Sequence, residues 1–211
     1  MKARVAGLLA VALLAAGCSS GTAQPTSSAP PSELNDHTDS QYQGLGLTPA
    51  QPRPQFTLTD TAGKPYKFGT VTAGKPTLLY FGYTHCPDVC PTTLADITQA
   101  LQKVPAAVRS VTQVVFVTTD VKRDTPAVLG TYLSKFDPGL PNHYIGLTGS
   151  QSDIDAAQVA AHVTLASDDG QTHAAQVLLY GSDDYARVAF LQSDNETDQI
   201  AHDLSLVAGI K

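Results

Sequence analysis

The amino-acid sequence predicts an α/β fold with a central mixed sheet flanked by helices. Short apolar runs typical of buried strands alternate with longer segments whose apolar residues recur at helical spacing. Two strand-like segments and a helix then close the chain. Apolar residues make up 42% and charged residues 15% of the 211 positions. This composition excludes a largely disordered chain and supplies enough apolar surface for a core.

The first half of the domain is predicted to contain a hairpin, two buried strands and two helices. Residues 56–59 alternate between polar and apolar, and a turn signal at 60–63 follows, which predicts an N-terminal β-hairpin extension. Thr125 and Pro126 are typical of an N-cap and the first residue of a helix. The predicted elements are a hairpin over 56–68, strands over 77–83 and 114–119, a helix over 91–104, and a helix from 126 with an apolar face of Val128, Leu129, Tyr132, Leu133 and Phe136.

The second half is predicted to contain three strands and two helices. Ser150 and Asp153 are spaced as a capping pair, and Gly209 is a typical signal for a helix C-terminus. The predicted elements are strands over 145–147, 176–180 and 187–191, a helix to about residue 161, and a helix over 196–207. Strands that alternate with helices and are closed by a hairpin and a helix predict a thioredoxin-like fold.

The first 17 residues are expected to be a lipoprotein signal peptide. Lys2 and Arg4 form a short basic start, and residues 5–16 form an apolar run that is too short to span a bilayer as a helix. The run ends in Leu-Ala-Ala-Gly-Cys at 14–18, which resembles a bacterial lipobox. Cys18 is therefore expected to carry acyl chains and to anchor the chain to the membrane. An ordinary secretory signal with an incidental cysteine is the alternative.

Residues 18–47 are expected to form a flexible tether, and residues 48–211 a single domain. Positions 19–40 hold 13 Ser, Thr, Gly or Pro among 22 residues, too polar a composition to form a core. The anchor would place the domain at the outer face of the cytoplasmic membrane. A net charge of −6 argues against nucleic-acid binding, which needs a basic face. We expect a monomer.

Two cysteines lie where a buried strand gives way to a helix. Cys86 and Cys90 are separated by three residues, and each is followed by a proline, so we expect a turn over 86–89 with Cys90 at the helix N-cap. There the helix dipole would lower the pKa of the Cys90 thiol. The two sulfurs could bind one soft metal ion, or could form a Cys86–Cys90 disulfide, which in an extracytoplasmic protein could be purely structural.

A third metal ligand is expected to be a histidine. His173 stands just before the strand predicted over 176–180, in a loop that could face the cysteines. His85 precedes Cys86 directly, but strand alternation would point its side chain away. The other histidines lie in the predicted tether, in loops or near helices, and are weaker candidates: His37, His143, His162 and His202.

Several segments together resemble the Sco/SenC family. They are GYTHCPDVCPTTL at 82–94, TTDVKRDTPAVL at 118–129, GLTGS at 146–150 and the histidine ahead of the strand over 176–180. The resemblance implies a thioredoxin-like fold and one copper ion, Cu(I) or Cu(II), bound by Cys86, Cys90 and His173. It also implies a role in assembling the binuclear copper site of cytochrome c oxidase subunit II, or in serving another copper enzyme.

Outside the three implied ligands, the sequence both matches the family and departs from it. Four polar residues match and are implied to surround the ligands or contact the partner: Asp88, Asp120, Arg123 and Asp124. Thr172 and Ala174 stand where the family pattern places Asp and Ser, on either side of the metal-binding histidine. This departure could change a hydrogen bond to the histidine and so the copper affinity.

Two functions are open at this point. The first is a copper metallochaperone. The second is a thiol–disulfide oxidoreductase that keeps the cysteines of the oxidase copper site reduced. Thioredoxins separate their thiols by two residues and carry a proline opposite them, whereas here three residues intervene and no proline stands beside His173. Both differences favour copper. Because metal and disulfide compete for the same two sulfurs, the copper-loaded and oxidised forms are expected to exclude each other.

Overall fold

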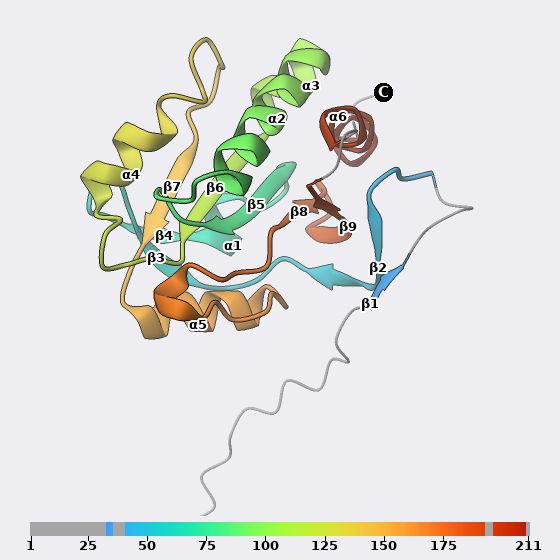
Figure 1. The fold of residues 1–211 in the computed structure, drawn as a ribbon. Helices are drawn as coiled ribbons and strands as arrows, with labels where there is room; N and C mark the ends of the chain where they lie inside the picture. The colour runs from blue at the N-terminus through green and yellow to red at the C-terminus, as the bar shows by residue number, and fades with distance from the viewer. Residues whose placement is uncertain (1–32, 36–40, 193–195, 210–211) are drawn as a thin grey trace, which may run out of the picture. The chain divides into compact units, whose positions relative to one another are not determined.

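The computed structural model describes residues 33–35, 41–192 and 196–209 (Figure 1). The predicted signal peptide over 1–17, the lipid-bearing Cys18 and most of the predicted tether lie outside the described residues. Within the described ranges, none of the helices has the length and apolar character needed to cross a bilayer.

A nine-stranded mixed sheet forms the centre of the domain, in the order β1-β2-β9-β8-β5-β6-β7-β3-β4. Strands β5, β6 and β7 pair in parallel, and β8 pairs with β5 in the antiparallel sense. The strands are β1 (Glu33–Asn35), β2 (Leu45–Pro52), β3 (Thr57–Asp60), β4 (Pro65–Lys67), β5 (Thr77–Gly82), β6 (Gln113–Thr118), β7 (Ile145–Thr148), β8 (Gln176–Tyr180) and β9 (Tyr185–Leu191).

Helices cover both faces of the sheet, as Figure 1 shows. They are α1 (Phe68–Val71), α2 (Val89–Lys103), α3 (Ala106–Val111), α4 (Pro126–Leu133), α5 (Gln151–Ala160) and α6 (Glu196–Val207), with a short 3-10 helix η1 (Asp168–Gly170). Strand β5 is buried on both faces, so its side chains alternate between two cores. Leu78 and Tyr80 pack with α2, α4 and α6, whereas Leu79 and Phe81 pack with α5.

Every predicted strand and helix is present, and the fold class is confirmed. Ser150 and Asp153 form the predicted capping box, and the Thr125 hydroxyl accepts the N–H of Val128 as an N-cap. The apolar face predicted for α4 is wrong at Val128, which is 37% exposed. Phe136 lies beyond the end of that helix, so it packs from the following turn.

Two strands of the sheet begin before residue 48, inside the segment expected to be a tether. Strand β1 pairs with β2, and β2 pairs with β9 from Leu45 onwards. Leu47 is only 6% exposed and belongs to the core that contains Phe81. A segment with few apolar residues can pair as a strand when an existing sheet offers an edge with free N–H and C=O groups.

Candidate metal site

The two cysteines lie at the point where β5 ends and α2 begins. The helix starts at Val89 with Asp88 as its N-cap, so Cys90 is the second helical residue and its predicted N-cap position is wrong. Pro91 fits into this first turn because the first N–H groups of a helix have no partner within it. The Cys90 side chain is 0% exposed, whereas Cys86 is half-buried in the loop.

A glycine at the end of β5 makes room for the Cys90 sulfur. A Cβ atom at Gly82 would lie 3.0 Å from Cys90 Sγ and 3.0 Å from the ring of Phe116. Such distances are shorter than nine in ten real Cβ contacts, and the neighbours here lie in a packed core that leaves them little room to move. The sulfur of Cys90 therefore packs against the backbone of β5.

The two thiols have opposite electrostatic environments. Burial raises the pKa of the Cys90 thiol to about 12. Burial also acts to raise the pKa of Cys86, but the backbone N–H groups of Cys90 and Asp88 outweigh it and hold this pKa below its ordinary value. The N–H of Cys90 lies 3.3 Å from Cys86 Sγ. The prediction that Cys90 is the activated thiol is therefore wrong, and Cys86 is the one that ionises more readily.

His173 lies beside the buried thiol. Its Nε2 is 3.5 Å from Cys90 Sγ, and its Nδ1 is 3.2 Å from the carbonyl oxygen of Ala174. Because a carbonyl only accepts, Nδ1 carries the proton in the neutral ring and Nε2 presents its lone pair to the sulfur. Burial lowers the pKa of His173, and the Ala174 carbonyl only partly opposes this. The imidazole is thus held in the neutral form that binds metals.

Two tyrosine rings hold the imidazole edge-on. The ring centroid of His173 lies 5.7 Å from that of Tyr83 and 6.2 Å from that of Tyr80. Such T-shaped contacts favour one orientation of the imidazole over others. Tyr83, directly after β5, was not singled out from the sequence, although an aromatic residue three positions before Cys86 was a visible signal.

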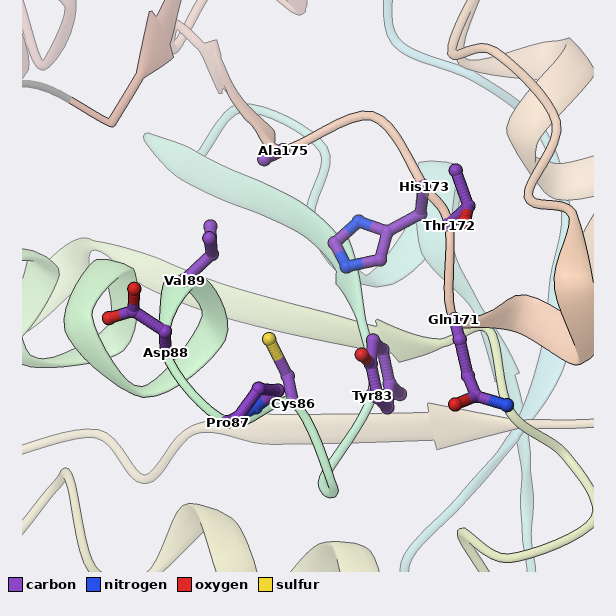
Figure 2. A pocket seen from close by; sticks show the side chains of 9 residues that line it. All are labelled: Tyr83, Cys86, Pro87, Asp88, Val89, Gln171, Thr172, His173 and Ala175. Atoms are coloured by element: carbon purple, nitrogen blue, oxygen red, sulfur yellow. The ribbon is translucent and has the colours of Figure 1, made fainter.

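An open pocket of about 320 Å³ gives access to the site (Figure 2). Figure 2 shows the Cys86 sulfur and the His173 imidazole facing this pocket, with the Asp88 carboxylate pointing away from the sulfur. Pro87 and Val89 on the cysteine side, and Gln171, Thr172 and Ala175 on the histidine side, complete the lining. The pocket thus lies between two segments that are far apart in the sequence.

The sulfur atoms of Cys86 and Cys90 and Nε2 of His173 are donors that suit a soft metal ion, but the three are not arranged around one metal position. Among the described residues, no three His, Cys, Asp or Glu side chains stand in the arrangement of a metal site. The 3.5 Å between Cys90 Sγ and His173 Nε2 nevertheless matches two ligands of one tetrahedral ion, which lie about 3.6 Å apart at ordinary S–metal and N–metal distances. Cys86 lines the same pocket as His173 and is the candidate third donor. Two thiolates and an imidazole suit copper.

The polar segment after β6 supports the start of the cysteine loop. Asp124 is 0% exposed and accepts three hydrogen bonds: from Thr84 N at 2.9 Å, Thr84 Oγ1 at 2.5 Å and Thr118 Oγ1 at 2.6 Å. Arg123 forms an ion pair with Asp120 and lies over the Tyr83 ring, 5.9 Å from its centroid. Three of the four implied surrounding residues thus act on Tyr83 and Thr84, while Asp88 stands at the N-cap position of α2 without a side-chain capping bond.

Three of the other histidines have side-chain partners away from the thiols, and His37 lies outside the described residues. His85 Nδ1 lies 3.0 Å from Thr84 Oγ1, and its side chain is half-exposed beside Asp124. His143 and His202 contact Asp137 and Asp203. Next to His173, the Thr172 hydroxyl donates to Asp168, so this threonine supports its own loop rather than the imidazole.

A family model described as SCO1/SenC matches residues 47–209. The chain is 38% identical over 115 residues to Protein SenC of Rhodobacter capsulatus (54% of this chain, 49% of that protein). It is 40% identical over 99 residues to the mitochondrial Protein SCO2 of Saccharomyces cerevisiae (47% of this chain, 31% of that protein). The matched segments thus span about half or less of these relatives' own length.

Solved structures agree over a larger share of the chain. Bradyrhizobium japonicum ScoI with copper bound is 34% identical, with a TM-score of 0.60 over 74% of this chain and 99% of that one. Apo Sco1 of Thermus thermophilus is 29% identical, with a TM-score of 0.65 over 78% of this chain and 96% of that one. The similarity therefore covers about three quarters of this chain.

Proposed function

Because the chain belongs to the SCO1/SenC family, we propose that it is a copper metallochaperone that binds one copper ion through Cys86, Cys90 and His173. The observation that carries the proposal is the His173 Nε2 lone pair, which faces the Cys90 sulfur at 3.5 Å from a loop 83 residues away. The copper-bound structure of a relative that is 34% identical supports copper as the ion.

The unequal thiols suggest an order of binding. Cys86 is accessible from the pocket and ionises more readily, so its thiolate captures the ion first. The ion then lowers the pKa of the buried Cys90 thiol, which loses its proton on binding, and His173 needs to lose none because it is already neutral. Release runs in the reverse order, and the exposed Cys86 side offers the ion to a partner.

We further propose the partner and the location. The partner would be cytochrome c oxidase subunit II or another copper enzyme, since family relatives share this fold and one solved relative carries copper. A lipid on Cys18 would hold a monomeric domain at the outer face of the cytoplasmic membrane. The sequence resemblance of residues 14–18 to a lipobox supports this placement.

Thiol–disulfide exchange is the second candidate function, and the unequal thiols favour it specifically. The Cys86 thiolate would attack a partner disulfide and form a mixed disulfide, releasing one partner thiolate. The Cys90 thiolate would then attack the Cys86 sulfur, releasing the second partner thiol and leaving a Cys86–Cys90 disulfide. The partner gains two electrons and this chain loses two. The three-residue spacing and the nearby imidazole make this function secondary to copper binding.

Copper titration of the reduced protein tests the primary proposal. We expect one copper per chain, lost in Cys86→Ser and Cys90→Ser and weakened more than about tenfold in His173→Ala. His143→Ala is the control, because it removes a histidine whose Nδ1 contacts Asp137 instead of the thiols, and this variant should bind copper normally. Unchanged affinity in His173→Ala would refute the ligand assignment. Absence of copper binding, together with reduction of a disulfide peptide from the oxidase site, would establish the second function.

A further inference from the structure

Thr119, directly after β6, contacts both segments that carry the proposed metal ligands. Thr119 is 0% exposed, and its N–H donates to the carbonyl of Gly82 at 2.8 Å, at the end of the strand that leads into the cysteines. Its hydroxyl lies 2.6 Å from the carbonyl oxygen of Gly170, in the loop that leads to His173. One residue therefore contacts the segment before the cysteines and the segment before the histidine.

The Thr119 hydroxyl donates its proton to the carbonyl of Gly170, in the loop that leads to His173. The same oxygen is also 3.2 Å from the Gly82 carbonyl, but a hydroxyl has one proton, and that carbonyl already accepts the N–H of Thr119. The Gly170 oxygen is closer and receives the proton. Since Gly170 is buried, loss of the hydroxyl would leave its carbonyl without this donor, which is costly in a buried site.

The loop that leads to His173 packs closely against the backbone of Thr119 at Gly170. Gly170 has a φ of +88°, and a Cβ atom there would lie 1.9 Å from the carbonyl oxygen of Thr119, so the two backbones are in direct contact. The ion pair between Lys122 and Asp169 also joins the two segments, but it is exposed and adds little.

The contact at Gly170 determines where His173 lies, because the intervening loop is closed on itself. Ser167 N donates to the Thr172 carbonyl at 2.8 Å, and Thr172 N donates to the Ser167 carbonyl at 3.2 Å. Residues 167–172 are thus a small unit closed by its own backbone hydrogen bonds. A shift at Gly170 would therefore be passed to His173, the residue immediately after this unit.

We propose that Thr119 is a positioning residue that sets the separation between His173 and Cys90. This inference rests on the proposed function for its metal readout. The Thr119 hydrogen bonds go to Gly82 and Gly170, so Thr119 acts on His173 through Gly170 and the closed unit of residues 167–172. The end of β6 thereby couples two loops that are not neighbours in the sequence.

The test is the Thr119→Val variant, which removes the hydroxyl and keeps the side-chain shape. We expect copper affinity to fall about tenfold in this variant, and to recover in Thr119→Ser, which retains the hydroxyl. The matched control is Thr112→Val, because Thr112 is 2% exposed and its hydroxyl also donates to a buried backbone carbonyl, that of Val108 at 2.8 Å. The copper affinity of Thr112→Val should equal that of the unmodified protein.

A double-mutant cycle separates positioning from general destabilisation. In a His173→Ala background the Thr119→Val change should have no further effect on copper affinity, because the ligand that it positions is already gone. A second readout needs no metal: amide hydrogen exchange across residues 167–175 should speed up in Thr119→Val and not in Thr112→Val.

Three outcomes are distinguishable. If Thr119→Val and Thr112→Val bind copper equally well, or if the Thr119→Val loss persists in the His173→Ala background, the positioning role is refuted. If the unmodified protein binds no copper, the proposed function fails. Amide hydrogen exchange that is faster in Thr119→Val but not in Thr112→Val would still establish that Thr119 holds the loop before His173. Unchanged exchange would refute that role of Thr119 as well.

Discussion

Replacing Asp124 by alanine should destabilise the metal-free protein much more than replacing it by asparagine. The carboxylate accepts three hydrogen bonds, from Thr84 N, Thr84 Oγ1 and Thr118 Oγ1. In Asp124→Ala the Thr84 N–H cannot turn away, because it is fixed on the backbone, and leaving it without an acceptor costs about 1–3 kcal/mol. Each hydroxyl can reorient, so the loss of each hydroxyl hydrogen bond costs about 0.5–1.5 kcal/mol. The expected destabilisation is about 2–6 kcal/mol.

The asparagine variant keeps most of this network. Its carbonyl oxygen can occupy the Oδ2 position, where it accepts from Thr84 N and Thr118 Oγ1. Its amide nitrogen then faces Thr84 Oγ1, which can accept as well as donate. Only the charge assistance of the hydrogen bonds is lost, and the expected destabilisation is about 1 kcal/mol.

Urea unfolding of the reduced, metal-free protein measures both changes. The midpoints should fall in the order unmodified, Asp124→Asn, Asp124→Ala, with an unchanged slope. Asp203→Ala is the matched control, because Asp203 is also 0% exposed and accepts backbone N–H groups, those of Gln43 and Gly44, away from the pocket. It should lose stability without changing copper affinity. Equal effects of the two Asp124 variants, or a loss below about 1 kcal/mol in Asp124→Ala, would contradict the hydrogen-bond reasoning.

Three further predictions concern the thiols and their surroundings. At neutral pH iodoacetamide should label Cys86 much faster than Cys90, because only the Cys86 pKa is lowered and only its sulfur reaches the pocket; peptide mapping showing equal labelling would contradict this. The raised pKa of Cys90 makes the unfolded chain lose this proton first, so stability should fall as the pH rises from the ordinary 9.0 towards about 12, with Cys90→Ser lacking this part of the fall. Gly82→Ala should destabilise the protein by about 1–3 kcal/mol and weaken copper binding, as measured by urea unfolding and titration, since its Cβ would crowd Cys90 Sγ; an unaffected affinity would show that the sulfur has room to move.

Most of the fold could be predicted because its signals are local. Strand β5 is a nearly continuous apolar run, and the capping box of α5 lies within four residues. The turn between β8 and β9 contains the turn-forming residues glycine and aspartate. The misses were of a different kind. Strand β2 is ordered because β9 offers it an edge, and no property of residues 41–47 alone reports that edge. Val128 stays exposed although it has the spacing of a buried residue.

For the candidate site, too, the residues could be predicted from local signals, whereas their pKa values could not. Cys86 and Cys90 were identified from their spacing and their place after a buried strand, and His173 from its place before another strand. The roles of the two thiols were reversed, because α2 begins earlier than the prolines suggested and carries Cys90 into the core. Burial and backbone N–H groups then set the two pKa values, and both depend on the packed structure.

The sequence by itself determined the chemistry available to this protein: two thiols at the start of a helix, several candidate histidines led by His173, and a family resemblance that implies copper. These are properties of residue type and short spacing. Only the tertiary structure decided which thiol is exposed, that the His173 lone pair faces Cys90, and that Thr119 contacts both segments that carry the proposed metal ligands. Those properties arise between segments 37 to 83 residues apart, where the parallel pairing of β5 with β6 and the antiparallel return of β8 bring distant backbone together.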